Sequence, residues 1–174
     1  MQEQVRLFAE AYEAGRTLEI GSYDVNGGVR QYFDDYIGID MREGPGVDEV
    51  MNSHNMHVFF GPDSFDTVLW LETIEHDRHW WLTLEQIHLV LKPGGLLYIS
   101  TPSPAMPEHS YPEDYWRFTR PGFKQLFVGC AIIAMEFENA AKSVAGTHIN
   151  MGSGTPESVP HIPDTYIGLG RKHA

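Results

Sequence analysis

The residues between positions 17 and 40 have types and spacing that suit the binding of a nucleoside. Two short apolar runs, 18–20 and 36–39, are typical of buried parallel strands. Glycines and small polar residues follow the first run, beginning at Gly21, and a carboxylate, Asp40, ends the second. Glycines let the backbone approach a ligand, and a terminal carboxylate can accept hydrogen bonds from both ribose hydroxyls. We therefore predict a site for a nucleoside-containing cofactor.

The same residues argue against a dinucleotide. The phosphate-binding pattern Gly-x-Gly-x-x-Gly is absent, because Ser22 and Tyr23 follow Gly21 and the next glycines are Gly27 and Gly28. A nicotinamide-dependent dehydrogenase is therefore disfavoured. For this segment alone, an ordinary turn of some other α/β protein is an open alternative.

The elements that must position these residues alternate between strands and helices. This alternation over residues 17–100 predicts a mostly parallel sheet with helices on both faces, in a single α/β domain of 174 residues. Predicted helices cover 2–14, 28–33, 80–91 and 121–127. Predicted strands cover 18–20, 36–39, 47–51, 65–71, 96–100 and 131–138, with a closing, antiparallel strand at 166–169. Residues 101–120 and 139–163 have no clean period.

Composition limits the partners. The net charge is -12 and no long run of Lys or Arg is present, so a nucleic acid or an anionic membrane surface is disfavoured. The lone cysteine, Cys130, excludes an intramolecular disulfide and a thiolate metal cluster, and we expect no metal and an inert, buried thiol. There is no secretory segment and no apolar stretch of about 18 residues, so we expect no membrane insertion and a cytoplasmic protein.

Three segments in order resemble the class I S-adenosylmethionine-dependent methyltransferases. Residues 19–21, Glu-Ile-Gly, resemble motif I, although Tyr23 occupies its usual second glycine. Residues 65–76 resemble the fourth strand with its Glu-His ending, and residues 91–97 resemble the Leu-Lys-Pro-Gly-Gly turn before the fifth strand. The resemblance covers about residues 17–100 and implies a Rossmann-like fold and S-adenosylmethionine as the cofactor. The Asp/Asn-Pro-Pro-aromatic motif of DNA methyltransferases is absent after the fourth strand.

The resemblance also implies a cofactor pocket. Asp40 would bind the ribose, Met41 the adenine face, Asn52 the adenine amine and Glu19 the methionyl ammonium. The predicted cofactor-binding residues are Glu19, Gly21, Ser22, Tyr23, Asp40, Met41, Asn52, Ser53, Leu71 and Glu72. Other roles stay open: Glu19 as a solvent-facing acid, Asp40 as a turn former and Asn52 as a helix cap.

The predicted catalytic residues are His76 and Tyr111. Methyl transfer needs a base only if the acceptor is protonated at the working pH, and His76 could equally cap or pack. His109 and Asp114, taken singly, fit a loop better than a base.

Residues 106–119 resemble a Pro-x-Asp-Tyr-Trp-Arg-Phe-Thr stretch of a bacterial and phage-type subgroup. They form either an acceptor lid or a packed loop with an ion pair between Asp114 and Arg117. We expect the ion pair, and we expect Tyr111 and Trp116 to line the acceptor pocket.

The sequence thus predicts methyl transfer from S-adenosylmethionine, by in-line displacement, to a small molecule, a glycan or a lipid head group. The alternative is a cofactor-binding module of the same fold that catalyses nothing. An oligomer is compatible with either.

Overall fold

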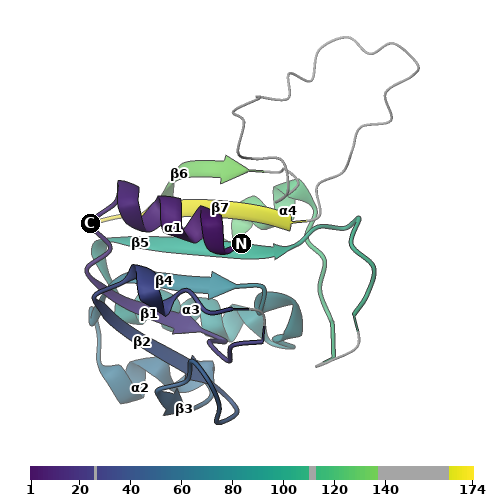
Figure 1. Cartoon of the computed structure of the whole chain (residues 1–174). Coiled ribbons are helices and arrows are strands. Elements are labelled where there is room, and N and C mark those ends of the chain that lie inside the picture. Colours follow the sequence, from purple (N-terminus) through teal and green to yellow (C-terminus); the bar gives the residue numbers. More distant parts are fainter. Residues whose placement is uncertain (26, 110–112, 137–164) are drawn as a thin grey trace.

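The computed structural model describes residues 1–25, 27–109, 113–136 and 165–174. Within these residues, seven strands form one sheet in the order β3-β2-β1-β4-β5-β7-β6 (Figure 1). The pairs from β3 to β5 are parallel, and β7 is antiparallel to both of its neighbours. The strands are β1 Arg16–Ile20, β2 Asp35–Asp40, β3 Glu49–Val50, β4 Phe65–Leu71, β5 Leu91–Pro102, β6 Cys130–Glu136 and β7 Thr165–Lys172. This confirms the predicted mostly parallel sheet and its antiparallel closing strand.

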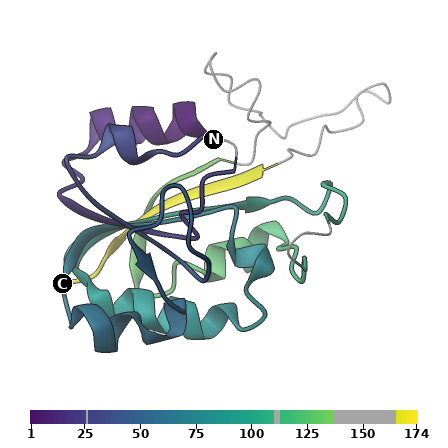
Figure 2. The ribbon, with the colours of Figure 1, turned by 60° about the horizontal axis from the view of Figure 1, so that its bottom comes forward.

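Helices cover both faces of the sheet (Figure 2). The helix α1, Gln2–Ala11, lies on one face together with the 3-10 turn η1, Arg30–Tyr32. The helices α2, Met56–Phe60, α3, Trp80–Val90, and α4, Arg120–Gln125, lie on the other. The sheet therefore sits between two hydrophobic cores, which explains why its central strands are apolar on both sides.

The strand β4 shows how the two cores share one sheet. Val68 and Trp70 belong to the core under α2, α3 and α4, whereas Leu69 and Leu71 belong to the core under α1. All four side chains are buried. Fully burying an aliphatic side chain contributes about 1.5–3 kcal/mol, so this strand stabilises both cores. The bounds predicted from its apolar run, 65–71, agree with the structure.

The elements on the α1 side and at the β3 edge are shorter than predicted. The helix predicted over 2–14 ends at Ala11, because Tyr12 takes an extended backbone and Gly15, at a φ of +56°, turns the chain into β1. The helix predicted over 28–33 is a single 3-10 turn. The third strand has two residues instead of five, and α2 was not predicted.

The turn at residues 92–95 lies inside β5 instead of before it. Leu91 pairs with Phe65 and Leu96 pairs with Thr67, so the register shifts across the turn. Since Leu91 already belongs to the strand, α3 ends at Val90, one residue earlier than predicted.

The parallel strands bring five segments to one edge of the sheet, at their carboxyl ends. These are the turn after β1, the end of β2, the 3-10 turns η2, Ser53–Asn55, and η3, Ile74–His76, and the segment that follows β5. Open α/β sheets bind their ligands at this edge. Within the part of the chain that the structure describes, no helix has the length and apolar character needed to cross a bilayer.

Candidate functional site

The turn after β1 is held against the end of β2. The backbone N–H groups of Gly21 and Ser22 both donate to the Ile39 carbonyl, at 2.9 and 3.0 Å. Gly21 has a φ of +77°, and a Cβ added there would overlap the side chain of Thr73. A glycine is therefore required at position 21 for two reasons, the positive φ and the close approach of the Thr73 side chain. The turn and Asp40 meet as predicted.

Asp40 ends β2 with a half-buried side chain. Its Oδ1 accepts a hydrogen bond from the backbone N–H of Arg42, at 2.9 Å, which bends the chain away after the strand. Asp40 thus forms a turn, the alternative role left open by the sequence, while remaining at the carboxyl edge. Met41 is 72% exposed, so its apolar side chain is available to a ligand.

Glu19 lies inside the fold, not in solvent. Only 7% of this residue is exposed, and the Tyr36 hydroxyl donates a hydrogen bond to its carboxylate. Burial raises the pKa of Glu19 to about 7, although the Tyr36 hydrogen bond and the nearby Arg30 charge act in the opposite direction and Asp24 adds to the rise. The solvent-facing alternative for Glu19 is therefore wrong.

Tyr23 closes the turn where motif I usually has a glycine. Its ring lies against Gly44, where an added Cβ would overlap it, and the Arg42 guanidinium lies 4.8 Å from the ring centroid. The neighbouring Asp24 N–H donates to the Pro45 carbonyl at 2.8 Å. The turn after β1 is thereby attached to the loop after β2.

Asn52 and Ser53 are engaged in local structure. The Oδ1 of Asn52 accepts from the His54 backbone N–H, at 2.9 Å, and so caps η2. The hydroxyl of Ser53 lies 2.8 Å from the hydroxyl of Thr83 on α3. The capping role considered for Asn52 is therefore present, and a contact of either residue with a cofactor stays a prediction.

Glu72 follows the buried Leu71 in a strained backbone conformation. Its φ is +44°, and its N–H donates to the Ser100 carbonyl at 3.1 Å. A left-handed conformation costs a residue with a Cβ about 1–2 kcal/mol. Burial raises the pKa of Glu72 to about 7, with Ser100 acting in the opposite direction, and its buried Oε1 has no hydrogen-bond partner.

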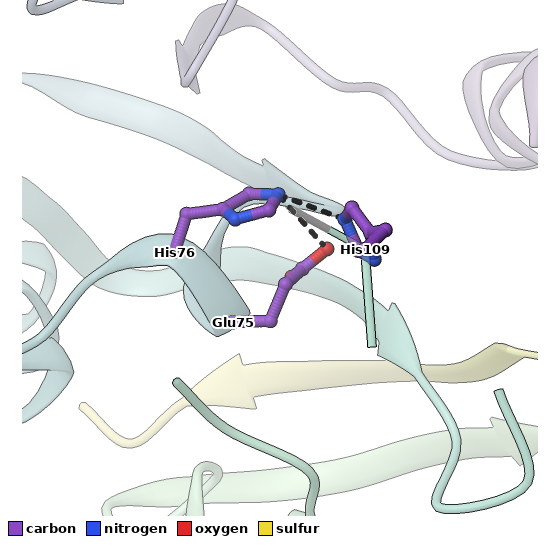
Figure 3. Close-up of side chains that lie close together, drawn as sticks. All are labelled: Glu75, His76 and His109. Atoms are coloured by element: carbon purple, nitrogen blue, oxygen red, sulfur yellow. Dashed lines mark hydrogen bonds and ion pairs between the residues drawn. The ribbon is translucent and has the colours of Figure 1, made fainter. Parts of the chain in front are cut away.

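Glu75 and His76 occupy η3, beside Glu72. Glu75 is 1% exposed; burial, and then the Glu72 charge, raise its pKa to about 8, and its Oε2 has no hydrogen-bond partner. The Nδ1 of His76 lies 3.0 Å from the Glu113 carbonyl, and burial lowers the pKa of this imidazole. The three side chains Glu75, His76 and His109 point toward one another (Figure 3).

His109 completes this group from the segment after β5. Its Nε2 lies 3.1 Å from the His76 Nε2, and its Nδ1 lies 3.1 Å from an oxygen of Asp114. The predicted ion pair between Asp114 and Arg117 is confirmed, with both guanidinium Nη groups donating to the carboxylate. Burial opposes the charge of Asp114, but the hydrogen bonds from Arg117 and the His109 backbone, together with the Arg117 charge, lower the pKa of Asp114.

Trp116 packs on the domain, and its expected place in the lining of the acceptor pocket stays a prediction. Its side chain is half-buried against the core under α3, and its indole N–H donates to the Asp77 carbonyl at 3.0 Å. Tyr111, the second predicted catalytic residue, lies outside the described residues.

The methyltransferase-domain family matches residues 2–154 of this chain. The chain belongs to this methyltransferase family. The match confirms the predicted enzyme class and, with it, S-adenosylmethionine as the cofactor. The narrower resemblance of residues 106–119 to one subgroup stays a prediction. No curated protein matches the chain.

Solved methyltransferase structures share the fold at low sequence identity. A S-adenosylmethionine-dependent methyltransferase from Archaeoglobus fulgidus is 16% identical, with a TM-score of 0.65 over 99% of this chain and 95% of that one. One from Mesorhizobium loti is 18% identical, with a TM-score of 0.62 over 99% and 98%. The 1,6-didemethyltoxoflavin-N1-methyltransferase of Burkholderia thailandensis, with bound 1,6-didemethyltoxoflavin and S-adenosylhomocysteine, is 14% identical, with a TM-score of 0.70 over 99% and 78%.

In this methyltransferase His109 meets His76, although the sequence around His109, taken singly, predicts only a loop residue. The signal that could have found it is positional: His76 follows β4, and His109 follows the neighbouring strand β5. Carboxyl ends of adjacent parallel strands meet at one edge, so residues that follow them can meet as well.

Proposed function

We propose that the chain transfers a methyl group from S-adenosylmethionine to an acceptor that donates hydrogen bonds, at the carboxyl edge of β1, β2 and β4. One observation carries the proposal. Two buried carboxylates, Glu19 and Glu72, lie at the carboxyl ends of the adjacent strands β1 and β4, and burial raises the pKa of each to about 7. Their environment therefore disfavours the anion, and a cationic ligand would stabilise it.

S-adenosylmethionine fits this environment, because it carries an ammonium group and a sulfonium group. The buried Oε1 of Glu72 lacks a partner and can accept from the ammonium, and Glu19 adds a second negative charge. The Ser22 hydroxyl is also buried without a partner beside the turn. A bound ligand would supply what these groups lack.

The remaining cofactor contacts follow from position. Asp40 would accept from the ribose hydroxyls, and the exposed Met41 would cover one adenine face. The Oδ1 of Asn52, though capping η2, retains a second lone pair for the adenine amine. The proposed cofactor-binding residues are Glu19, Gly21, Ser22, Tyr23, Asp40, Met41, Asn52, Ser53, Leu71 and Glu72.

The cofactor supplies an electrophilic methyl group on a sulfonium whose sulfur leaves as a neutral thioether. The protein then has to hold the acceptor in line with the methyl group and keep water out. Glu75 and His76 lie next to Glu72, and we propose that they face the acceptor, with Tyr111 as a further acceptor contact. Unpartnered carboxylate oxygens would favour a hydroxyl or an amine and disfavour an anionic acceptor. A small molecule, a glycan or a lipid head group with such groups would suit this site.

A cofactor-binding module without activity is the second candidate, and Tyr23 favours it. The Tyr23 ring fills the position of the second motif I glycine and lies between Gly44 and Arg42. Binding of S-adenosylhomocysteine together with no methylated product from any extract would select this candidate.

The proposal also covers the kind of partner, the number of domains and the location of the protein. With a net charge of -12, a nucleic-acid substrate is disfavoured on electrostatic grounds. We further propose a single domain and a cytoplasmic location. An oligomer is compatible with the proposal.

Calorimetry with three ligands tests the proposed cofactor site. We expect S-adenosylmethionine and S-adenosylhomocysteine to bind and NAD not to bind. A Glu72→Gln variant should bind S-adenosylmethionine about 10-fold to 100-fold more weakly, because a hydrogen bond to a charged group is worth about 1.5–3 kcal/mol. Glu13→Gln, at an exposed position, is the matched control and should leave the affinity unchanged. Binding of NAD with no binding of either sulfur compound would refute the assignment.

Activity is tested separately, with S-adenosylmethionine that carries a tritiated methyl group. The full-length protein is incubated with it and with fractionated cell extract, and labelled products are sought. A labelled alcohol-derived ether or methylated amine supports the proposed acceptor class, and a labelled carboxylate ester contradicts it.

A further inference from the structure

His76 presents an unprotonated nitrogen to the carboxyl edge. Its Nδ1 lies 3.0 Å from the Glu113 carbonyl oxygen. A carbonyl can only accept, so the hydrogen of the neutral imidazole is on Nδ1. The Nε2 atom therefore has a bare lone pair, and this is the atom that faces His109.

His109 presents the same nitrogen in the same state. Its Nδ1 lies 3.1 Å from Asp114 Oδ2, nearer than the 3.5 Å that separate it from the Arg117 guanidinium. The Asp114 side chain is 1% exposed and ion-paired with Arg117, so it is an ionised acceptor that favours a hydrogen on Nδ1. Two bare Nε2 lone pairs thus face each other at 3.1 Å, which is unfavourable unless a cation lies between them.

Glu75 adds a carboxylate to the same point. Its Oε1 lies 3.7 Å from the His76 Nε2, and its buried Oε2 has no hydrogen-bond partner. One ligand atom from each of Glu75, His76 and His109 lies within 4.8 Å of the others (Figure 3). Leaving such a carboxylate buried without a partner is costly, and a cation would compensate both the carboxylate and the lone pairs.

We propose that Glu75, His76 and His109 bind one divalent transition-metal ion of the Zn²⁺ type. Zn–N and Zn–O bonds of about 2.0–2.2 Å place adjacent ligand atoms about 3.0–3.6 Å apart. The two shorter separations, 3.1 and 3.7 Å, are close to that range. The third separation, between Glu75 and His109, is the longest. The His109 side chain is 45% exposed on a loop, so a small movement of this side chain can shorten that separation. Two imidazoles with one carboxylate suit Zn²⁺ or Fe²⁺, whereas Mg²⁺ and Ca²⁺ prefer oxygen ligands.

The groups behind the ligands are those that a metal site requires. Metal-binding histidines usually donate their other ring N–H to a carbonyl or a carboxylate, as His76 does to Glu113 and His109 does to Asp114. The backbone beside His109 is also held: the His109 N–H donates to Asp114 at 3.0 Å, and Arg117 donates to the Pro107 carbonyl at 3.0 Å.

One consequence rests on the proposed function. Three protein ligands leave a position open, which an acceptor hydroxyl would fill. Coordination makes that hydroxyl more acidic. Its O–H bond breaks with the proton going to solvent, and an oxygen lone pair then bonds to the methyl carbon as the carbon–sulfur bond breaks, leaving a neutral thioether. No free histidine base is needed.

Metal binding is tested on the full-length protein without cofactor or acceptor. The protein is dialysed against a chelator, then titrated with Zn²⁺ in a calorimeter and with Co²⁺ under visible absorption. We expect one equivalent of each ion and Co²⁺ bands typical of nitrogen and oxygen ligands. His109→Gln should weaken Zn²⁺ binding by about 100-fold or more, since loss of an outer partner alone costs 10–100-fold. Because the His109 side chain is partly exposed, we expect the His109→Gln variant to fold like the wild type.

His54→Gln is the matched control. The His54 Nε2 lies 3.4 Å from Asp77 Oδ1, so this is another histidine–carboxylate pair, and the described residues add no third ligand to it. Its Zn²⁺ affinity should equal that of the wild type. The proposal fails if no saturable one-equivalent binding occurs, if both variants weaken it equally, or if Mg²⁺ competes with Zn²⁺. Zn²⁺ binding in a protein that does not bind S-adenosylmethionine would support the metal site and refute the proposed function.

Discussion

The Glu19→Gln substitution isolates the ionisation of one buried carboxylate in β1. The charged groups that act on Glu19 are Arg30, which favours its anion, and Asp24, which opposes it, while Tyr36 donates a hydrogen bond. Burial outweighs these groups and raises the pKa of Glu19 from its ordinary value of 4.5 to about 7. The folded protein therefore favours the protonated form, which a glutamine resembles in shape and charge.

The size of the effect follows from the pKa. One pKa unit corresponds to about 1.4 kcal/mol, so a rise from 4.5 to about 7 corresponds to about 3 kcal/mol. Because the folded-state pKa is raised, this stabilising contribution is complete below pH 4.5 and is lost as the pH rises through 7. The variant cannot ionise at this position and keeps its stability above pH 7.

Urea unfolding of both proteins at pH 5, 6, 7 and 8 measures this difference. The free energy of unfolding of the variant, relative to the wild type, should increase with pH by up to about 3 kcal/mol. Glu72 and Glu75, whose pKa values are also raised by burial, are present in both proteins and cancel in the difference. A difference that is constant with pH, or that moves the other way, would refute the reasoning.

The same residue predicts a pH dependence of cofactor binding. The ammonium of S-adenosylhomocysteine favours the Glu19 anion, so binding is linked to loss of its proton. For a pKa of about 7, the ionised fraction rises about tenfold between pH 6 and pH 8. The affinity of the wild type should therefore rise more steeply between pH 6 and pH 8 than that of Glu19→Gln, in which Glu72, whose pKa is also about 7, still ionises near the ammonium. Equal pH profiles for the two proteins would place the ammonium elsewhere.

Two further substitutions test the site and its surroundings. Asp40→Ala should weaken S-adenosylhomocysteine binding by about tenfold or more in calorimetry, because each charge-assisted bond to a ribose hydroxyl is worth about 1.5–3 kcal/mol. Asn52→Ala removes a neutral hydrogen bond worth about 0.5–1.5 kcal/mol and should weaken binding less; the reverse order in folded variants would mean that the pocket is wrongly assigned. Trp116→Ala should destabilise the fold by up to about 3–5 kcal/mol in thermal unfolding and leave the affinity of the folded protein unchanged. A variant that keeps its stability but loses turnover would show that Trp116 lines the acceptor pocket.

The sequence predicts best those elements whose pattern is strong in a short window. The apolar run 65–71 gives β4 with its observed bounds, and the order of strands gives the parallel sheet. It predicts poorly the elements that depend on distant contacts. The helix α2 has two well-exposed apolar residues, Val58 and Phe59, so no amphipathic period marks it. Likewise, only the pairing of β4 with β5 shows that residues 92–95 lie inside a strand.

The meeting of the turn after β1 with the end of β2 could be predicted, because the two strands are close in sequence. Gly21 and Asp40 each end an apolar run, and parallel pairing of those runs brings them together. The histidine cluster is harder to predict, because His76 and His109 are 33 residues apart and only the pairing of β4 with β5 places the segments that carry them at one edge. The predicted absence of a metal rested on the single cysteine, a criterion that says nothing of imidazole ligands.

Several unfavourable features of the described residues lie at one edge of the sheet. Glu72 combines a left-handed backbone with a buried oxygen that has no partner, and Glu75 is buried with a second such oxygen. The Nε2 atoms of two imidazoles face each other at 3.1 Å. Each feature destabilises the protein by itself. Destabilising features of this kind are expected at sites that bind a ligand. A cationic cofactor near Glu72 and a metal ion at His76 would relieve different members of the set, so each ligand should raise the melting temperature alone and both together should raise it further.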